Sequence, residues 1–283
     1  MILAIDLGGT KLQFGLFAPD GSLIYSDTLA TDPDFLKQLT LLLKRQLGDQ
    51  PDIGIVSLGV PGPVLDNVML GSKPLNCNQG IDFNSFLSWL KVPFIVRNDL
   101  YMAAHFELYE GVGKQHQNFC MVSISTGIGV ATAINGKILD RRLEMGHQIL
   151  SPDFEPRLAC LNHYNCWASL SSGAGIVGRF GNSNYSTTEK VFSHVLRQED
   201  ITSLRMVNAQ AFGNLVTAYD PQVIVVMGSV ALHQFDKIIP SPEDIASFTV
   251  NLPAPDIVKS KAGGDVGMLG ACYAARDWKQ GPG

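Results

Sequence analysis

Long apolar runs are missing from this sequence. The best candidate, VIVVMGSVAL at residues 223–232, is interrupted by a glycine and is much shorter than the roughly 20 apolar residues that cross a bilayer. The first residues have neither the charged region nor the cleavage site of a secretory signal. We therefore expect no membrane partner and no export.

Positive charge is also scarce. The chain has 21 Lys and Arg against 26 Asp and Glu, a net charge of −5, and no basic block or tail, so we expect no nucleic-acid partner. The five cysteines are odd in number and scattered, which argues against a disulfide framework and favours the reducing cytoplasm.

The first part of the chain has the pattern of a mixed α/β lobe. Alternating and continuous apolar segments, separated by Gly and Pro turns, predict three strands, then helices alternating with further strands. Helical spacing of apolar residues follows an acidic start near residue 34. The predicted strands are 2–6, 12–17, 23–30, 53–60 and 93–98, and the predicted helices are 32–48, 82–91 and 100–111.

The same plan then repeats. Residues 119–139 again give strand, Gly-containing turn, strand, tight turn and strand, followed by helices near 167–180, 186–197 and 200–219. Strands at 222–229 and 255–260 and a helix at 265–280 complete it. We expect an α/β protein with two lobes, 1–115 and 116–283, around a central cleft, with the last helix packing on the first lobe.

The two glycine turns suggest phosphate binding. Gly8 and Gly9 follow the first strand, and residues 125–129 form the matching turn. Exposed backbone N–H groups in such turns bind phosphate. Asp6 would repel phosphate and is better explained as a Mg²⁺ ligand, directly or through water, and Lys11 would neutralise phosphate charge. The alternative is two ordinary hairpins with Asp6 capping a turn. No G-x-x-x-x-G-K-[ST] loop occurs.

Seven motifs in this order give the sequence a family resemblance. They resemble those of the ROK sugar kinases, which have two ribonuclease H-like lobes in the actin-like ATPase and sugar kinase fold. The motifs are DLGGTK (6–11), GVPGPV (59–64), RNDLYMAAHFE (97–107), STGIGVATAINGK (125–137), EMGH (144–147), DPQVIVVMGSVA (220–231) and GGDVGMLGA (263–271).

The resemblance implies roles for particular residues. Asp99 would be the general base that accepts the hydroxyl proton, although the residue type and position also fit a helix N-cap. The sugar would be bound by Asn98, Asp99, Glu144, His147 and Gly62. ATP and Mg²⁺ would be bound by Asp6, Gly8, Gly9, Thr10, Lys11, Thr126, Gly127, Gly129, Gly228 and Ser229.

A zinc site of the family is altered in this chain. Many ROK proteins bind a structural zinc through the His of the Glu-x-Gly-His motif and three cysteines. Cys166 matches the last cysteine, but the other two positions fall on Ala159 and Leu161. His147, Cys160, His163 and Cys166 form a possible alternative set with unfamiliar spacing. Since a closed zinc site needs four ligands, the sequence favours a protein without zinc.

Two further positions depart from the family pattern. Ala168 stands where the family has a sugar-binding Glu. This suggests a modified or different sugar, or poor affinity, with the Ser169 hydroxyl as a candidate partial substitute. Ser229 replaces a common Gly near the adenine, and a small residue there should still admit the nucleotide.

The leading functional prediction is an ATP-dependent hexose kinase of the glucokinase type, acting on O6 and forming a homodimer by resemblance. Alternatives are a kinase for an N-acetylhexosamine or another modified sugar, a polyphosphate-using kinase, and a non-catalytic sugar sensor. A DNA-binding repressor is disfavoured, because the first phosphate motif begins at Ile5 and leaves no preceding helix-turn-helix.

Overall fold

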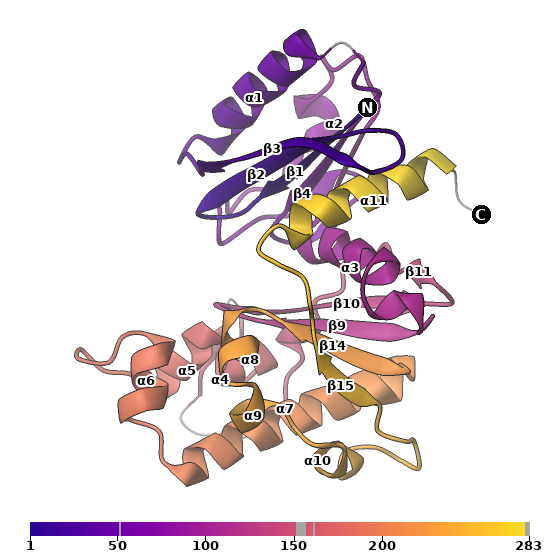
Figure 1. The fold of residues 1–283 in the computed structure, drawn as a ribbon. Coiled ribbons are helices and arrows are strands. Elements are labelled where there is room, and N and C mark those ends of the chain that lie inside the picture. Colours follow the sequence, from indigo (N-terminus) through magenta and orange to yellow (C-terminus); the bar gives the residue numbers. More distant parts are fainter. Residues whose placement is uncertain (51, 151–156, 161, 281–283) are drawn as a thin grey trace. The chain divides into compact units, whose positions relative to one another are not determined.

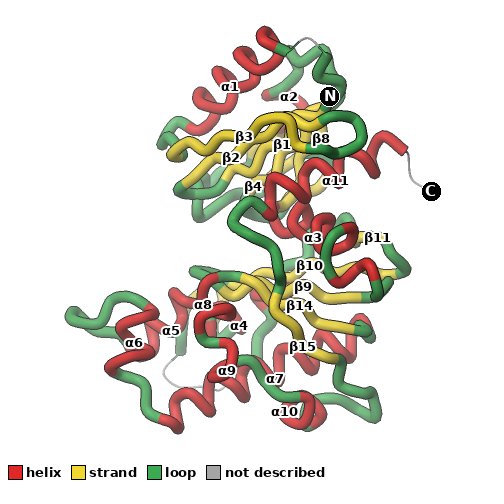
Figure 2. The backbone as a smooth tube through the Cα atoms, viewed as in Figure 1, coloured by secondary structure: helices red, strands yellow, loops and turns green. Residues whose placement is uncertain are grey.

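The computed structural model describes residues 1–50, 52–150, 157–160 and 162–280. Contacts divide the chain into two units, each built on a five-stranded sheet (Figure 2). Unit 1 comprises Met1–Gly111, Ile138–Arg142 and Lys261–Gly283, and unit 2 comprises Val112–Lys137 and Leu143–Ser260. A division at residue 115 would place residues 138–142 in the second lobe, whereas their contacts group them with unit 1.

Unit 1 has a mixed sheet in the order β3-β2-β1-β4-β8. The first three strands are antiparallel neighbours, and β4 and β8 join in parallel, as expected when helices connect the later strands. A small sheet of β5, β6 and β7, which the sequence pattern did not predict, follows β4. The elements are β1 (Ile2–Leu7), β2 (Lys11–Phe17), β3 (Leu23–Ala30), α1 (Phe35–Asp49), β4 (Ile55–Val60), β5 (Val64–Leu65), β6 (Val68–Met69), β7 (Ile81–Asp82), α2 (Phe83–Phe86), β8 (Phe94–Asn98), α3 (Asp99–Tyr109) and α11 (Val266–Gln280).

Helices cover both faces of this sheet, with α1 on one face and α3 and α11 on the other (Figure 1). Successive side chains of a strand point to opposite faces, so Leu3 and Ile5 of β1 pack in the α1 layer, and Ile2 and Ala4 pack in the α11 layer. Both layers are apolar, which explains why β1 has an unbroken run of hydrophobic residues before Asp6.

The packing of α11 on α3 is unusually close. A Cβ atom at Gly270 would lie 1.8 Å from the backbone oxygen of Met102, so only glycine fits there. Further along the two helices, Nε2 of His105 lies 3.4 Å from Oδ2 of Asp277, and Oδ1 of the same carboxylate accepts a hydrogen bond from the Tyr109 hydroxyl. The C-terminal helix is therefore an integral part of unit 1.

Unit 2 repeats the arrangement with a sheet in the order β11-β10-β9-β14-β15. The pairs β9–β10 and β9–β14 are antiparallel and parallel respectively, as in unit 1. The elements are η1 (Val112–Lys114), β9 (Phe119–Ile124), β10 (Ile128–Ile134), β11 (Lys137–Ile138), η2 (Met145–His147), β12 (Ala159–Cys160), β13 (His163–Tyr164), α4 (Trp167–Ser171), α5 (Gly173–Phe180), α6 (Thr188–His194), α7 (Gln198–Tyr219), β14 (Val223–Met227), α8 (Ser229–His233), α9 (Phe235–Ile238), α10 (Pro242–Ala246) and β15 (Asp256–Lys259).

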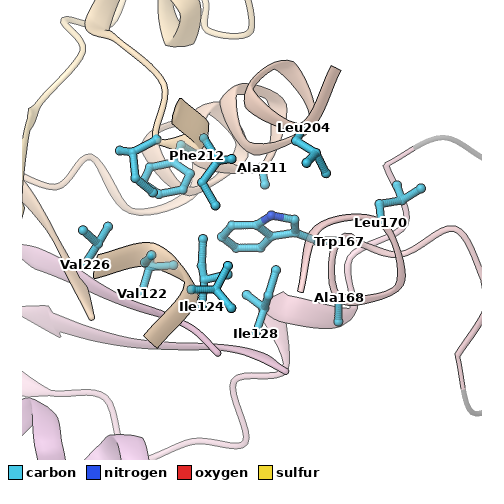
Figure 3. Packing of buried hydrophobic residues seen from close by; sticks show 14 of the residues in the cluster. Val122, Ile124, Ile128, Trp167, Ala168, Leu170, Leu204, Ala211, Phe212 and Val226 are labelled. Atoms are coloured by element: carbon cyan, nitrogen blue, oxygen red, sulfur yellow. The ribbon is translucent and has the colours of Figure 1, made fainter. Parts of the chain in front are cut away.

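Trp167 anchors α4 in the core of unit 2 (Figure 3). Its side chain is fully buried and meets Phe212 of α7 edge to face, with ring centroids 5.7 Å apart. The indole N–H donates to Oδ1 of Asn208 over 2.7 Å, which satisfies the polar atom that burial of a Trp requires. This anchor fixes the position of Cys166, the residue that precedes α4.

Among the helices in the described part of the chain, none combines the length and the apolar character needed to cross a bilayer.

Candidate functional site

The first glycine turn of unit 1 has no room for a side chain at Gly9. A Cβ atom at Gly9 would lie 2.5 Å from the carbonyl oxygen of Pro74. The N–H of Gly8 donates to the carbonyl of Lys11 over 2.8 Å, and the Thr31 hydroxyl donates to the carbonyl of Gly8 over 2.7 Å. Gly9 and Thr10 are exposed at the tip. The turn is thus a fixed, bare section of backbone of the kind that suits an oxyanion.

Asp6 lies beside this turn in a confined position. Its carboxylate faces glycines on neighbouring elements, because a Cβ atom would lie 3.6 Å from Oδ1 at Gly59 and 2.3 Å from Oδ2 at Gly267. Burial raises the pKa of Asp6 to about 6, and Lys11 opposes the rise. A buried carboxylate with a raised pKa is destabilised as an anion, and a divalent cation would relieve that cost.

Lys11 is held near the start of α11. Its ammonium donates to Oε1 of Gln13 over 2.8 Å and to the carbonyl of Gly264 over 2.7 Å. The predicted phosphate motif and the Gly-rich entry to the last helix therefore meet within unit 1. A Lys in this position supplies positive charge at the edge of the turn.

The end of β8 brings Asn98 and Asp99 to the edge of the same sheet. We expected Asp99 as a possible N-cap of the following helix, but the cap is Asn98. Its Oδ1 accepts from the N–H groups of Leu100 (2.9 Å) and Tyr101 (3.3 Å). Asp99 is the first residue of α3, and its Oδ1 accepts from the Leu100 N–H over 2.9 Å. The residue predicted as a base is therefore the first residue of the helix and not its N-cap.

Asn98 also binds the predicted sugar-side loop. Its Nδ2 donates to the carbonyl of Gly62 over 2.9 Å. Gly62 has φ +118°, and a Cβ atom there would lie 2.3 Å from the carbonyl oxygen of Gly71, so this position requires glycine. With one N–H committed to Gly62, the amide of Asn98 has one more N–H to offer a ligand.

The second glycine turn, in unit 2, joins β9 to β10. The N–H groups of Gly173 and Ala174, at the start of α5, donate to the carbonyls of Ser125 (2.7 Å) and Thr126 (3.1 Å). A Cβ atom at Gly127 would meet nothing within 4 Å, so the tip faces open space. Gly129 lies on β10 opposite Ser123.

Gly228 and Ser229 follow β14 at the same edge of the sheet. Gly228 has φ +90°, and a Cβ atom there would lie 2.5 Å from the carbonyl oxygen of Ile124. The hydroxyls of Ser229 and Ser125 are 3.2 Å apart. The parallel pairing of β9 and β14 thus brings together two motifs that are about a hundred residues apart in the sequence.

A large cavity in unit 2 begins at these turns. Its volume is about 1040 Å³, at the upper end of the range for small-molecule sites. Of the predicted nucleotide residues, Thr126 and Ser229 line it. The other lining residues have no motif in the sequence, because no local pattern marks the helices that form the walls. These additional lining residues are Gly173, Ala174, Val177, Gly178, Ser186, Thr187, Thr188, Glu189, Ser193, Val230, His233 and Gln234.

Glu144 and His147 lie at the two ends of η2. Burial raises the pKa of Glu144, and His147 opposes the rise. Oε2 of Glu144 is 3.9 Å from Nε2 of His147. The other ring nitrogen, Nδ1, faces two thiols, Cys160 at 3.4 Å and Cys166 at 3.8 Å.

These contacts belong to a group of four metal-ligating side chains. Ligand atoms of His147, Cys160, His163 and Cys166 all lie within 4.8 Å of one another. Zinc–sulfur and zinc–nitrogen bond lengths in a tetrahedron place S and N about 3.6 Å apart, close to the two separations of His147 Nδ1. The buried Nε2 of His163 lacks a hydrogen-bond partner among the described residues.

The donor chemistry of this group fits zinc. Two thiols and two imidazoles are the ligands of many structural zinc sites. Burial raises the pKa of Cys166, but hydrogen bonds, led by that with His147, lower it to about 6, which favours the thiolate that binds metal. The expectation against zinc depended on the register of the cysteines. The fold gathers four donors in spite of that register, while Leu161 lies outside the described residues.

Ala168, which stands where the family resemblance leads us to expect a sugar-binding Glu, is a residue of the hydrophobic core. Ala168 is 8% exposed and belongs to the hydrophobic core of unit 2. The hydroxyl of Ser169 donates to the carbonyl of Cys166 over 2.9 Å, so its proton is already used. This segment therefore offers no carboxylate in place of the missing Glu.

Comparisons with known proteins agree over almost the whole chain. Residues 2–277 match the model of the ROK family. An N-acetyl-D-glucosamine kinase of Yersinia pseudotuberculosis is 26% identical over 308 residues, covering 96% of this chain and 98% of its own. An N-acetylmannosamine kinase of Yersinia pestis is 24% identical and covers 97% and 98%. The crystal structure of a ROK family protein from Streptococcus pneumoniae, in complex with sucrose, has a TM-score of 0.78 and 26% identity, covering 99% of both chains.

Proposed function

The chain belongs to the ROK family, with the actin-like α/β fold predicted from its motifs, and we propose that it is an ATP-dependent sugar kinase. The observation that carries this proposal is that two neighbouring residues, Asn98 and Asp99, have different structural roles at the end of β8. Asn98 caps α3 and binds the Gly62 loop, and the Asp99 carboxylate follows it at the first position of α3, where Oδ1 accepts from the Leu100 N–H. Phosphoryl transfer requires such a group to accept the hydroxyl proton.

In this proposal, ATP binds in the cavity of unit 2. The bare turn at Thr126–Gly127 and the fixed glycine at position 228 would face its phosphates, and the cavity would hold the nucleoside. The turn at Gly8–Gly9 of unit 1, with Thr10 and Lys11, would bind the transferred phosphoryl group. Gly129 would act by keeping the start of β10 free of a side chain.

Asp6 would hold Mg²⁺, directly or through water. The metal would supply positive charge that offsets the charge of the phosphates. The confined, half-buried carboxylate with a raised pKa supports this assignment. The donor is proposed to be ATP and not polyphosphate, because the chain is acidic overall and a polyphosphate channel needs many cations.

We propose an N-acetylated hexosamine as the substrate, with O6 as the acceptor and glucose as the alternative. Relatives named for two N-acetylhexosamines align along 96% and 97% of the chain. Glu144 and His147, with Asn98, would bind the hydroxyl groups. Ala168 supplies no carboxylate, which removes one hydroxyl ligand expected for unmodified glucose.

We also propose that the four-donor group of His147, Cys160, His163 and Cys166 binds one structural zinc. The separations around His147 Nδ1 and the orphaned Nε2 of His163 support this proposal. Zinc would fix the segment between Glu144 and α4, which carries proposed sugar ligands.

The test is an assay that couples ADP release to an absorbance signal, with MgATP and a panel of N-acetylglucosamine, N-acetylmannosamine, glucose and mannose. The protein is compared with Asp99→Asn and with Asp49→Asn, a control on the exposed side of α1. We expect sugar-dependent turnover that Asp99→Asn reduces at least 1000-fold and Asp49→Asn leaves unchanged.

The outcomes separate the remaining alternatives. Turnover with glucose but not with N-acetylhexosamines would reverse the substrate assignment. Turnover with polyphosphate but not with ATP would reverse the donor. Sugar binding without turnover under any condition would contradict the kinase and favour a sugar sensor.

A further inference from the structure

The side chain of Arg97 makes four polar contacts at the end of β8. Its Nε contacts both carboxylate oxygens of Asp140, at 2.8 and 2.9 Å. Its Nη1 donates to Oδ1 of Asn67 over 3.1 Å and to the carbonyl of Val96 over 2.9 Å. The Arg97 side chain is 14% exposed. The guanidinium is therefore held in one orientation by charged and neutral acceptors together.

Asp140 lies in the middle of a five-residue segment, 138–142, which we call the excursion because the chain leaves unit 2 for unit 1 and then returns. Residues 138–142 belong to unit 1, whereas the segments before and after them, up to Lys137 and from Leu143, belong to unit 2. The Asp140 side chain is 35% exposed, and its backbone carbonyl accepts from the Arg141 side chain over 2.7 Å. The ion pair with Arg97 is thus a side-chain anchor for the excursion.

The anchor lies close in sequence to proposed sugar ligands on both sides. Arg97 directly precedes Asn98 and Asp99, and Asp140 precedes Glu144 by four residues. Four residues of fully extended chain span at most about 14 Å. Glu144 can therefore move no further than this from Asp140, however the rest of unit 2 is oriented.

We propose that Arg97 and Asp140 form a positioning pair that tethers Glu144 to the strand end that carries Asn98 and Asp99. The inference rests on the proposed function, since it takes these residues as sugar ligands. Neither member of the pair is assigned a contact with the sugar. The pair limits the freedom of the segment that leads to Glu144.

This role predicts a selective kinetic effect. Every residue that lines the cavity proposed for ATP belongs to unit 2, and none is in residues 138–142. Loss of the tether should therefore weaken sugar binding and leave nucleotide binding unchanged. A purely structural role would instead lower the stability of unit 1 and affect both substrates through loss of folded protein.

The first test compares Asp140→Asn, Arg97→Gln and the double variant with Asp49→Asn, which breaks the exposed Arg45–Asp49 pair of α1. We expect Asp140→Asn to raise the sugar KM about tenfold or more, with the KM for ATP within about twofold. The double variant should be no worse than the worse single variant, because both remove one interaction. The proposal would be overturned if the folded Asp140→Asn protein had an unchanged sugar KM. It would also be overturned if the effects of the two single variants on the sugar KM added fully in the double variant.

A second test changes the tether and spares the ion pair. Insertion of two glycines between Arg142 and Leu143 lengthens the connection by about 7 Å. The sugar KM should rise as in Asp140→Asn, whereas the same insertion in the exposed turn at Asp20–Gly21 should have no such effect. Equal effects of the two insertions would contradict a tether.

A third readout does not depend on activity. Hydrogen–deuterium exchange of the segment 138–147 should be faster in Asp140→Asn than in the unaltered protein, with no change at 223–234. If no sugar supports turnover in the unaltered protein, the proposed function fails and the exchange result still decides the tether. Unchanged exchange at 138–147 would overturn it.

Discussion

The carboxylate of Asp6 lies directly against the backbone of Gly267, so closely that a Cβ atom there would be 2.3 Å from Oδ2. The contact joins the end of β1 to the first turn of α11, at opposite ends of the sequence. Burial in this position raises the pKa of Asp6 to about 6. In the folded protein without a bound cation, the ionised form of Asp6 is therefore less stable than it is in water.

We expect Asp6→Asn to stabilise the protein and to remove Mg²⁺-dependent turnover. The folded state holds the proton of Asp6 more tightly than the unfolded chain, so stability falls as pH rises from about 4 to 6 and stays low above that range. The shift from 3.8 to about 6 corresponds to at most about 3 kcal/mol. Urea unfolding at pH 7.5 without Mg²⁺ measures this gain. A less stable Asp6→Asn protein would contradict the assignment.

The same carboxylate should set the acidic limit of activity. Mg²⁺ binding needs ionised Asp6, so at low Mg²⁺ the value of kcat/KM should fall below about pH 6 and not near pH 4. Raising the Mg²⁺ concentration should move this limit to lower pH, because the cation competes with the proton. A limit that is independent of Mg²⁺ would assign it to another group.

We expect about one zinc per chain in protein purified without chelators, measured by elemental analysis. Cys160→Ser and His163→Ala should each lower the zinc content and the melting temperature, because metal binding stabilises only the folded state. Cys77→Ser, in unit 1, is the matched control and should keep the metal. Unaltered protein without zinc would overturn the site.

The Asn208 side chain should be essential for the core of unit 2. It accepts from the Trp167 indole over 2.7 Å and donates to the carbonyl of Ile238 over 2.8 Å. Asn208→Ala leaves both partners buried and unsatisfied, and we expect a loss of about 2–4 kcal/mol in urea unfolding. Asn184→Ala, on an exposed turn, should change stability by less than about 0.5 kcal/mol. A small effect at Asn208 would mean that water replaces the side chain.

Gly228 should tolerate no side chain. Its φ of +90° and the 2.5 Å approach to the Ile124 carbonyl mean that Gly228→Ala must shift the turn after β14. We expect nucleotide affinity to fall at least tenfold, measured by calorimetry with the non-hydrolysable analogue AMPPNP. Gly48→Ala, in α1 with nothing within 4 Å of its added Cβ, is the control. Equal affinity of Gly228→Ala and the unaltered protein would place the nucleotide elsewhere.

Local patterns in the sequence predict the main strands and the long helices of both units, and they indicate the family. Apolar strands that end in glycine turns, repeated once along the chain, predict two α/β units because strand and helix periodicities are local properties. The buried residues Phe35, Leu39, Leu42 and Leu43 of α1 agree with that periodicity. Motif order identified the ROK family in the same way, since each motif is a continuous segment.

Only the tertiary structure decided which residues share a task. Capping depends on φ and ψ, so Asn98 and not Asp99 is the N-cap of α3. The walls of the cavity come from helices without a common motif. The four potential metal ligands gather although their spacing is unfamiliar, because Trp167 fixes α4 and the preceding pair of strands places Cys160 and His163. Arg97 and Asp140 are 43 residues apart, so no local sequence pattern predicts the ion pair between them.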